Sequence, residues 1–457
     1  MLENTSVERI KEIRERQDRY FRSGAPLDIK TRLSNLKAFE AAVRKWEKPL
    51  CDALWTDLHK SYEEAYLTEV SILLGEIRSH IRNIRKWSRP KWEPTPLKMF
   101  PSSSRIISEP LGTALIIAPW NYPVQLLLTP LVGAISSGCT AVLKPSPYVP
   151  NVSKVTERMI QDTFRDEYVA VVQGNRDVNT ALLNERWDLI FFTGSPSLGR
   201  KVMGAAAKNL TPVVLELGGK SPCIVDKDAD LKVAARRIAW GKSLNAGQTC
   251  IAPDYLMLHE EIKDRFLKEL KDSFKELLGE NPKESQHFVR IVNDKAFDRL
   301  ESYLQDGKTV FGGHTDKSER YFEPTIIDGV SPDAQVMSEE IFGPVFPTLT
   351  FKDIDEVISF VTSREKPLAL YYFGGQGDRV LRHTSSGGAC VNDTIMHIAN
   401  ERIPFGGVGN SGLGSYHHKR SFDAFTHYRA VVKTPTWLDL PFRYMPYKFF
   451  KMVKRLL

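Results

Sequence analysis

The sequence predicts an α/β protein built on a parallel, doubly wound sheet, with a second α/β unit and a small β arm. The first observation is an alternation of short apolar runs and helical patterns over residues 113–215, typical of a parallel sheet. The second is a similar alternation from Ser221 to about Thr394. The third is the length of 457 residues, which is too long for one hydrophobic core and predicts two or three domains.

The N-terminal part of the chain is predicted to be helical. Thr5 and Glu8 have the spacing of a capping box, which predicts a helix that ends near Gly24. Apolar residues then recur at helical spacing over residues 33–46, and residues 50–88 continue this pattern.

The segment from Trp87 to Pro110 has a different composition, because it is basic and rich in proline. We expect it to form an arm or hairpin outside the main sheet. A final strand is predicted at Ala430–Lys433.

The parallel sheet is predicted from five apolar runs separated by helices. Ligands bind at the carboxyl ends of such strands, where polar residues of this chain collect. The predicted strands are 113–118, 140–143, 168–172, 189–192 and 212–215, with helices at 124–136, 178–184 and 197–208, and the polar strand ends are Pro119–Pro123, Lys144–Ser146, Phe192–Ser195 and Glu216.

The uncharged stretch from Leu111 to Leu143 is long enough to suggest a membrane span. Three prolines interrupt it, and Asn121 and Gln125 would lack partners in lipid. We therefore interpret it as a buried strand, turn, helix and strand.

Composition and charge limit the class of protein. Hydrophobic residues make up 42% and charged residues 26%, and the net charge of +7 is scattered, so nothing indicates nucleic-acid binding. The five cysteines are widely spaced without a CxxC pair, which favours a reducing cytosol over disulfides or a metal site. The charged N-terminus is not typical of a signal peptide.

The stretch Gly241–Asp254 contains the candidate nucleophile, Cys250. A small, polar, glycine-bearing turn precedes this cysteine and could present its thiol to a cleft. On this stretch alone, a nucleophile and an inert core thiol are equally compatible. Glu216, which ends an apolar run and precedes two glycines, favours the nucleophile, because an acyl intermediate needs a base to activate water.

The motifs ELGGKSP, starting at Glu216, and GQTCIAPDY, around Cys250, resemble the aldehyde dehydrogenase superfamily and its class 3 branch of fatty and aromatic aldehyde dehydrogenases. The similar motifs extend from about Pro119 to Val431. The resemblance implies a Rossmann-type cofactor domain, an α/β catalytic domain and a β oligomerisation arm. The implied parts are an NAD(P)-binding domain at 1–86 and 109–215, a catalytic domain at 216–398, bridging segments at 87–108 and 415–440, and a basic-aromatic tail at 441–457.

The resemblance also implies oxidation of aldehydes to carboxylic acids with NAD or NADP as hydride acceptor. Cys250 would attack the carbonyl carbon as a thiolate and form a thioester. Asn121, in PWNYP, would stabilise the oxyanion together with the backbone N–H of Cys250. Glu216 would activate the hydrolytic water. Read without the family, Asn121 is a turn cap between prolines and Glu216 a salt-bridged carboxylate.

The cofactor site is implied by FTGSPSLG, which resembles the phosphate-binding turn of the family. The motif is nearly a P-loop, but Arg200-Lys201 stands where Lys-Ser/Thr is required, which argues against an NTPase. In isolation Lys144 and Glu340 would be surface charges and Phe342 a core residue. The residues implied to contact cofactor are Lys144, Thr193, Gly194, Ser195, Gly199, Glu340 and Phe342.

Two positions depart from the family pattern. Pro147 replaces the carboxylate that usually follows the motif lysine and repels a 2′-phosphate, so we expect tolerance of NADP as well as NAD. His418 replaces the glycine of the family's Tyr-His-Gly, which restricts the backbone.

Class 3 likeness suggests a homodimer and an apolar, aromatic aldehyde pocket. The positions that match this pocket are Tyr66, Tyr122, Thr249 and His397, and they favour medium- to long-chain aliphatic or aromatic aldehydes. We expect a cytoplasmic protein. The tail at 441–457 interleaves basic and aromatic residues, so it either contacts an anionic membrane surface or packs on the substrate entrance or a partner subunit.

Two other functions compete with this interpretation. A CoA-acylating dehydrogenase would pass the acyl group to CoA, which the presence of Glu216 as a water-activating base opposes. A non-catalytic relative kept as a binding or structural protein is opposed by the presence of Cys250, Asn121 and Glu216.

Overall fold

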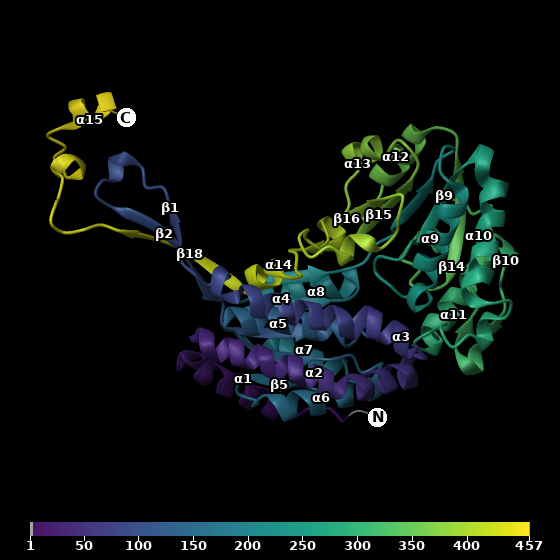
Figure 1. Ribbon diagram of the computed structural model, residues 1–457, viewed down its shortest axis with the longest axis horizontal. Coiled ribbons are helices and arrows are strands. Elements are labelled where there is room, and N and C mark those ends of the chain that lie inside the picture. Colours follow the sequence, from purple (N-terminus) through teal and green to yellow (C-terminus); the bar gives the residue numbers. More distant parts are fainter. Residues whose placement is uncertain (1–2, 457) are drawn as a thin grey trace.

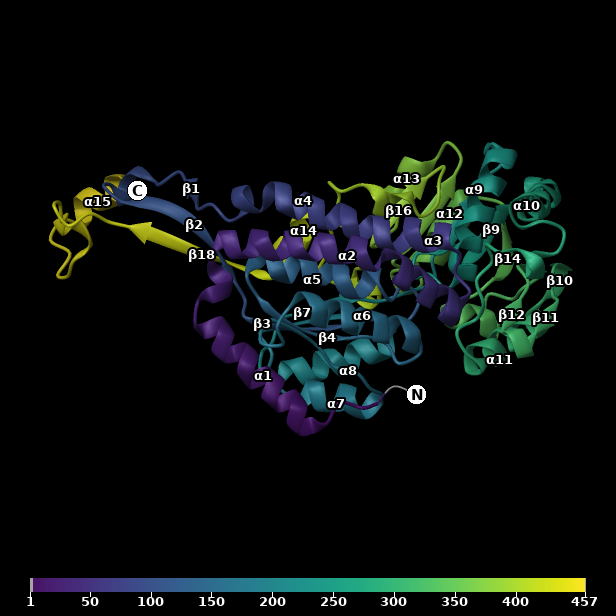
Figure 2. The ribbon, with the colours of Figure 1, turned by 60° about the horizontal axis from the view of Figure 1, so that its bottom comes forward.

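The computed structural model describes residues 3–456 and contains two large sheets and a small one. Met1, Leu2 and Leu457, at the ends of the predicted N-terminal domain and tail, lie outside the described residues. The two large α/β units lie side by side, and the small antiparallel sheet projects from the first unit, away from the second (Figures 1 and 2). The predicted fold class is therefore confirmed.

The first unit is a six-stranded sheet in the order β17-β7-β6-β3-β4-β5, parallel except for β17. The chain builds outward from β3 through β4 and β5 and then returns to β6 on the other side of β3. This reversal between β3 and β6 is where doubly wound sheets bind ligands. The strands are β3 Thr113–Ile117, β4 Thr140–Lys144, β5 Val169–Val171, β6 Leu189–Thr193, β7 Val213–Glu216 and β17 Gly412–Leu413.

Helices cover both faces of this sheet, as its continuous apolar strands require. The uncharged stretch forms β3, the fully buried helix α5 and β4, as interpreted from the sequence. In residues 3–456, no helix is both long and apolar enough to cross a membrane. The helices are α1 Val7–Arg22, α2 Ile29–Leu58, α3 Tyr62–Ala65, the π-helical turn η2 Tyr66–Val70, α4 Ser71–Trp87, α5 Gln125–Ser137, α6 Pro150–Thr163, α7 Arg176–Asn184 and α8 Pro196–Ala207.

The predicted capping box at Thr5 and Glu8 is wrong. Ser6 caps α1, because its hydroxyl accepts from the N–H of Arg9 at 3.2 Å. The Thr5 hydroxyl instead accepts from the N–H of Gln173 at 3.0 Å, so a tertiary contact takes the side chain that the local pattern assigned to the cap.

The second unit is a seven-stranded sheet in the order β10-β13-β14-β9-β8-β15-β16. Only β10 runs antiparallel to its neighbour. The strands are β8 Pro222–Val225, β9 Tyr255–His259, β10 Lys308–Phe311, β13 Thr325–Asp328, β14 Val345–Phe351, β15 Ala369–Phe373 and β16 Gly388–Val391, and the main helices are α9 Leu231–Ser243, α10 Lys263–Leu278, α11 Asp294–Ser302, α12 Ile354–Thr362 and α13 Gly377–His383.

The predicted arm forms the small antiparallel sheet of β1 (Lys91–Glu93), β2 (Ser103–Pro110) and β18 (Thr426–Lys433). β18 begins earlier than the predicted strand because it pairs with β2 along the whole of that strand. The tail continues past β18 and ends in the short helix α15 (Phe450–Leu456), beside the far end of the arm (Figures 1 and 2).

Candidate active site

One cavity of about 680 Å³ opens at the carboxyl ends of β3, β6 and β7, and residues of the second unit complete its wall. The strand order explains this convergence, because parallel neighbours end at one edge of a sheet. Asn121 follows β3, Thr193 ends β6 and Glu216 ends β7. The predicted residues that line this cavity are Asn121, Thr193, Gly194, Ser195, Glu216, Cys250, Glu340 and Phe342.

Cys250 is half-buried and follows a strained turn, Leu244–Gly247. Asn245 and Ala246 both have φ of 51°, a left-handed conformation that is costly for residues with a Cβ. Gly247 also has a positive φ, and a Cβ there would lie 2.3 Å from the carbonyl oxygen of Gly343. This turn passes close to the backbone at Gly343 and leaves Cys250 at the cavity wall.

Burial raises the pKa of the Cys250 thiol, and the carboxyl groups of Glu340 and Glu216 raise it further. Burial therefore disfavours the thiolate form of Cys250. The thiol must lose its proton to a base during attack.

Glu216 is 2% exposed. Neither of its carboxylate oxygens has a hydrogen-bond partner among residues 3–456, and burial raises its pKa well above the ordinary value. A carboxyl group without protein partners keeps its lone pairs available to water, as a general base requires.

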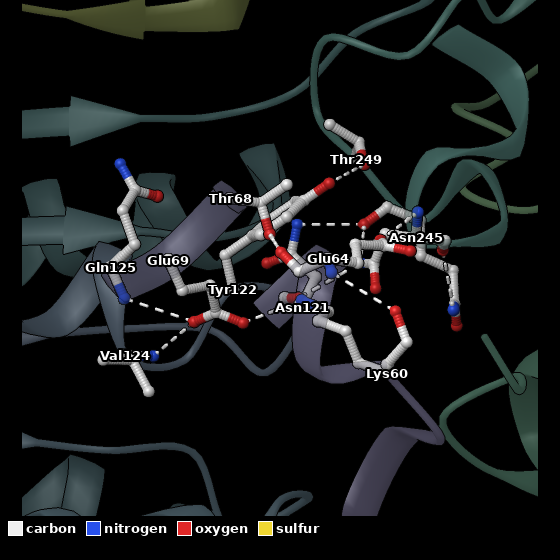
Figure 3. A network of polar contacts seen from close by, with 12 residues as sticks. Lys60, Glu64, Thr68, Glu69, Asn121, Tyr122, Val124, Gln125, Asn245 and Thr249 are labelled. Carbon is white, nitrogen blue, oxygen red and sulfur yellow. Dashed lines mark hydrogen bonds and ion pairs between the residues drawn. The ribbon is translucent and has the colours of Figure 1, made fainter. Parts of the chain in front are cut away.

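Asn121 is 2% exposed, and its amide is held in one orientation (Figure 3). Its Nδ2 donates to the carbonyl oxygen of Gln248 at 3.0 Å, two residues before Cys250. The second N–H of this amide is available to another acceptor, so the side chain can donate to an oxygen in the cavity.

The residues at the end of β6 fit an anionic dinucleotide. Ser195 precedes α8, and its Oγ lies 3.1 Å from Oγ of Ser197 rather than capping the helix. The positive end of the α8 dipole thus lies at the cavity, which Pro196 and Ser197 also line. The Thr193 hydroxyl is buried, and no group within residues 3–456 hydrogen-bonds to it. These features match the helix N-terminus and free donors that a pyrophosphate needs.

The two glycines of the turn are closely packed within the chain itself. A Cβ on Gly194 would lie 2.7 Å from the ring of Phe192, and a Cβ on Gly199 would lie 2.7 Å from the side chain of Leu217. Gly199 lies inside α8 and lets that helix approach the loop after β7.

Glu340 and Phe342 contribute to the wall from the second unit. A Cβ on Gly218 would lie 2.0 Å from Oε2 of Glu340, so any larger residue at position 218 would displace this carboxyl group. Phe342 packs edge-to-face on Trp120, with ring centroids 5.5 Å apart.

A family model described as "Aldehyde dehydrogenase family" matches residues 2–431. The chain belongs to this family.

Relatives support the assignment over nearly the whole chain. A 4,4'-diaponeurosporen-aldehyde dehydrogenase of Staphylococcus aureus is 46% identical, covering 95% of this chain and 96% of the relative. Aldehyde dehydrogenase family 3 member A2 of Rattus norvegicus is 45% identical (90% and 86% covered), and a dimeric, NADP-preferring aldehyde dehydrogenase of Canis lupus familiaris is 42% identical (96% and 98%). The solved structure of Staphylococcus aureus AldH in a substrate-bound state is 44% identical, with a TM-score of 0.96 over 98% of this chain and 99% of that one. The chain is an NAD(P)-dependent oxidoreductase, and its class 3 resemblance is confirmed.

Several predicted residues of this aldehyde dehydrogenase lie outside the cavity wall. Lys144 ends β4, and its ammonium donates to the carbonyl oxygen of Pro145 at 2.7 Å, while burial lowers its pKa to about 8. Tyr122 and Thr249 are joined by a hydrogen bond of 2.7 Å between their hydroxyls, beside Asn121 and Cys250 in the chain.

Tyr66 and His397 are the remaining pocket candidates. Tyr66 begins the π-helical turn and stacks on Tyr62, with centroids 6.3 Å apart. His397 stacks on Phe405, and burial lowers its pKa to about 4. The substrate roles of these residues remain predictions.

The aldehyde dehydrogenase cavity also contains residues that the sequence analysis missed. Lys220 lies in the ELGGKSP motif, which could have identified it, and its ammonium donates to carbonyl oxygens of Val336 and Glu339. Arg299, on α11, donates to the carbonyl oxygens of Glu340 at 3.1 Å and Ile341 at 2.8 Å. Arg299 also donates to the Tyr303 hydroxyl at 3.0 Å, and no motif of the sequence marks it.

Proposed function

We propose that this aldehyde dehydrogenase oxidises medium- to long-chain aliphatic or aromatic aldehydes to carboxylic acids through a thiohemiacetal and a thioester on Cys250. The supporting observation is that Cys250, Glu216 and Asn121, which are far apart in the sequence, line one cavity. A nucleophile, a base without protein partners and an amide donor are the groups that this chemistry needs.

In the first step the sulfur of Cys250 bonds to the carbonyl carbon while the thiol proton passes to Glu216, which releases it to solvent before the last step. Negative charge develops on the aldehyde oxygen, which accepts from the free N–H of Asn121 and from the backbone N–H of Cys250. Removing one such donor typically costs about 3 kcal/mol of transition-state stabilisation.

A bound nicotinamide dinucleotide supplies the hydride acceptor that converts the thiohemiacetal into a thioester. Thr193, Gly194, Ser195 and Gly199 would form the phosphate turn, and Lys144, Glu340 and Phe342 would contact the ribose and ring side.

In the last step Glu216 takes a proton from water, whose oxygen attacks the thioester carbon. The carbon–sulfur bond breaks, the carboxylic acid leaves, and the sulfur of Cys250 regains a proton.

The decisive experiment combines activity with mass spectrometry of the intact protein. Cys250→Ser should abolish NAD(P)H formation and leave no mass adduct, whereas Cys139→Ser, which changes a thiol outside the cavity lining, should keep both. Activity that survives Cys250→Ser would refute the proposal.

The substrate class is supported by the aromatic pocket candidates Tyr66 and Tyr122 and by the relative named for 4,4'-diaponeurosporen-aldehyde. An aldehyde panel of increasing chain length plus benzaldehydes tests it. We expect kcat/KM to rise with chain length, and a preference for acetaldehyde would contradict the proposal.

Cofactor choice is proposed to include NADP, because Pro147 stands where a carboxylate would repel a 2′-phosphate. A relative named NADP-preferring is consistent with this. Pro147→Glu should raise the KM for NADP about tenfold and change the KM for NAD little. A wild-type preference for NAD of several hundredfold in kcat/KM would refute it.

We also propose a homodimer, with β1, β2 and β18 as the bridging parts, supported by the relative named dimeric. Sedimentation of the intact chain tests this. A monomer at micromolar concentration would contradict it.

The tail is proposed to contact anionic membrane surfaces. Met445 is 79% and Phe450 60% exposed, and basic residues alternate with aromatic ones along the tail. Removing residues 441–457 should abolish flotation with anionic liposomes. Unchanged flotation would remove the hypothesis.

A further inference from the structure

A buried ion pair contacts the backbone of the segment from Asn121 to Val124. Lys60 follows α2, Glu69 lies on the π-helical turn η2, and their side chains are fully buried with Nζ and Oε1 2.7 Å apart (Figure 3). Burying two charges costs several kcal/mol per ion, so such a pair is weak evidence for stability by itself. Its other contacts indicate what it does.

Glu69 caps the helix that follows Asn121. Its Oε2 accepts from the N–H of Val124 at 2.8 Å and from the N–H of Gln125 at 3.3 Å. Val124 is the N-cap of α5 and has no polar side chain, so the cap comes from a distant element. A carboxylate at the N-terminus of a helix is also stabilised by the helix dipole.

Lys60 holds the other end of the same short segment. Its Nζ donates to the carbonyl oxygen of Asn121 at 3.0 Å and lies 4.2 Å from the ring centroid of Tyr122. The pair therefore fixes the backbone on both sides of Tyr122-Pro123 (Figure 3).

The same carbonyl connects to the loop that carries the nucleophile. Asn245 Nδ2 donates to the carbonyl oxygens of Asn121 at 3.1 Å and Gln248 at 3.0 Å. The carbonyl oxygen of Gln248 also accepts from the side-chain amide of Asn121. The side chains of Asn121 and Asn245 therefore donate to the same carbonyl oxygen. A change at Lys60 or Glu69 would thus alter the direction of the Asn121 amide.

We propose that Lys60 and Glu69 are positioning residues that direct the Asn121 amide toward the oxygen of the bound aldehyde. This inference rests on the proposed role of Asn121 as oxyanion donor. Geometry within a fraction of an ångström decides the strength of such a donor, so displacement of the segment reduces the rate without removing a catalytic group.

The test compares Lys60→Met and the isosteric Glu69→Gln with a matched control, Asp57→Asn. Asp57 is also a buried carboxylate that caps a helix, α6, through the N–H groups of Asn151 and Val152, both at 2.9 Å. It lies on α2 and touches neither Asn121 nor the Cys250 loop in the described contacts.

Four measurements separate positioning from folding: steady-state kinetics, ester hydrolysis, alkylation and thermal melting. We expect Lys60→Met and Glu69→Gln to lower kcat about 10- to 100-fold. This decrease should not exceed the one that follows removal of the Asn121 amide. The KM for cofactor should change less than about threefold. Cofactor-free hydrolysis of 4-nitrophenyl acetate should fall in parallel, because it passes through the same oxyanion. Alkylation of Cys250 by iodoacetamide should keep its rate. Asp57→Asn should lower Tm and keep kcat.

A double-mutant cycle with Asn121→Ala decides the route of the effect. If Lys60 acts through Asn121, Lys60→Met should change kcat less than about threefold in the Asn121→Ala background. A full multiplicative loss, or wild-type kcat in folded Lys60→Met and Glu69→Gln proteins, would overturn the inference. Wild-type kcat in Asn121→Ala alone would instead refute the proposed oxyanion role.

Discussion

Glu69 and Glu216 are both buried, but their carboxylates differ in their hydrogen-bond partners. Glu69 is fully buried and Glu216 is 2% exposed. Glu69 accepts from Lys60 and from two backbone N–H groups at the start of α5. Glu216 lines the cavity, and its oxygens have no partner within the part of the chain that the structure describes.

The difference separates a structural carboxylate from a reactive one. The lone pairs of Glu69 are occupied by groups of the protein, which fixes its orientation and lets it hold a helix in place. The lone pairs of Glu216 remain available, and burial raises its pKa, so it can take a proton from water. The surrounding donors, rather than the residue type, decide the role.

The largest expected effect concerns Glu216 and its pH dependence. Glu216→Gln should lower kcat by roughly 10²–10⁴, because a general base typically contributes that factor. Only the ionised form can accept a proton, and the pKa of Glu216 is raised, so kcat of the wild type should increase as pH rises toward that pKa and then level off. Steady-state rates between pH 6 and 10 measure this.

The variant Glu216→Gln should show a flat profile over the same range and accumulate the thioester, visible as a mass adduct on the protein. A variant that keeps the rising limb would show that another group titrates. Glu216 would then not be the general base, and the proposed difference in role between the two glutamates would be refuted.

The next largest effect concerns the stability that Glu69 provides. Glu69→Ala leaves the ammonium of Lys60 buried without its counter-ion, which should cost about 3–5 kcal/mol in the free energy of unfolding. Urea denaturation measures it. Asp57→Asn leaves no buried cation without a counter-ion, so its free energy of unfolding should decrease less. Equal decreases in the two variants would contradict the importance of the ion pair.

A smaller effect is expected at an exposed cap, which sharpens the comparison. Ser6→Ala removes the hydroxyl that caps α1 and should lower the free energy of unfolding by about 1 kcal/mol. Because no residue of α1 lines the cavity, kcat should not change. A decrease in kcat would indicate that helix caps affect the site generally, and that the cap on α5 is not special.

The smallest effect on stability is expected when α8, like α5, receives a carboxylate at its N-terminus. Ser195→Asp places a carboxylate at the start of α8 and should stabilise the cofactor-free protein by about 0.3–1 kcal/mol. The same charge should weaken dinucleotide binding about fivefold, as two like charges 4 Å apart in water repel by ~1 kcal/mol. Thermal melts and fluorescence titration measure the two effects, and tighter binding would contradict the role of this helix end.

Much of the site was predictable because it is encoded in strand ends and motifs. Asn121, Glu216 and Cys250 each follow a recognisable apolar run or turn, and the cavity joins them as expected. The cap at Thr5 failed for a specific reason, since Gln173, far away in the chain, takes its hydroxyl. Helix α6 was missed, although Pro150 at its first position is a start signal.

His418 illustrates what a motif comparison leaves open. It adopts φ of 50° in place of the family's glycine, and its backbone N–H donates to both carboxylate oxygens of Glu76 at 2.7 and 2.8 Å. This buried anchor accounts for how a side chain is held in a backbone conformation that glycine adopts more easily.

The amino-acid sequence was enough to predict the α/β architecture, the succession of strands and helices in the first unit, and the three residues that meet in the cavity. Apolar periodicity and chain order carry that information, because parallel neighbouring strands must end at a common edge. Only the tertiary structure decided that Lys60, Glu69 and Arg299 support the site. Each of them satisfies backbone groups of a distant segment, and a backbone carbonyl or N–H leaves no mark on the pattern of side chains.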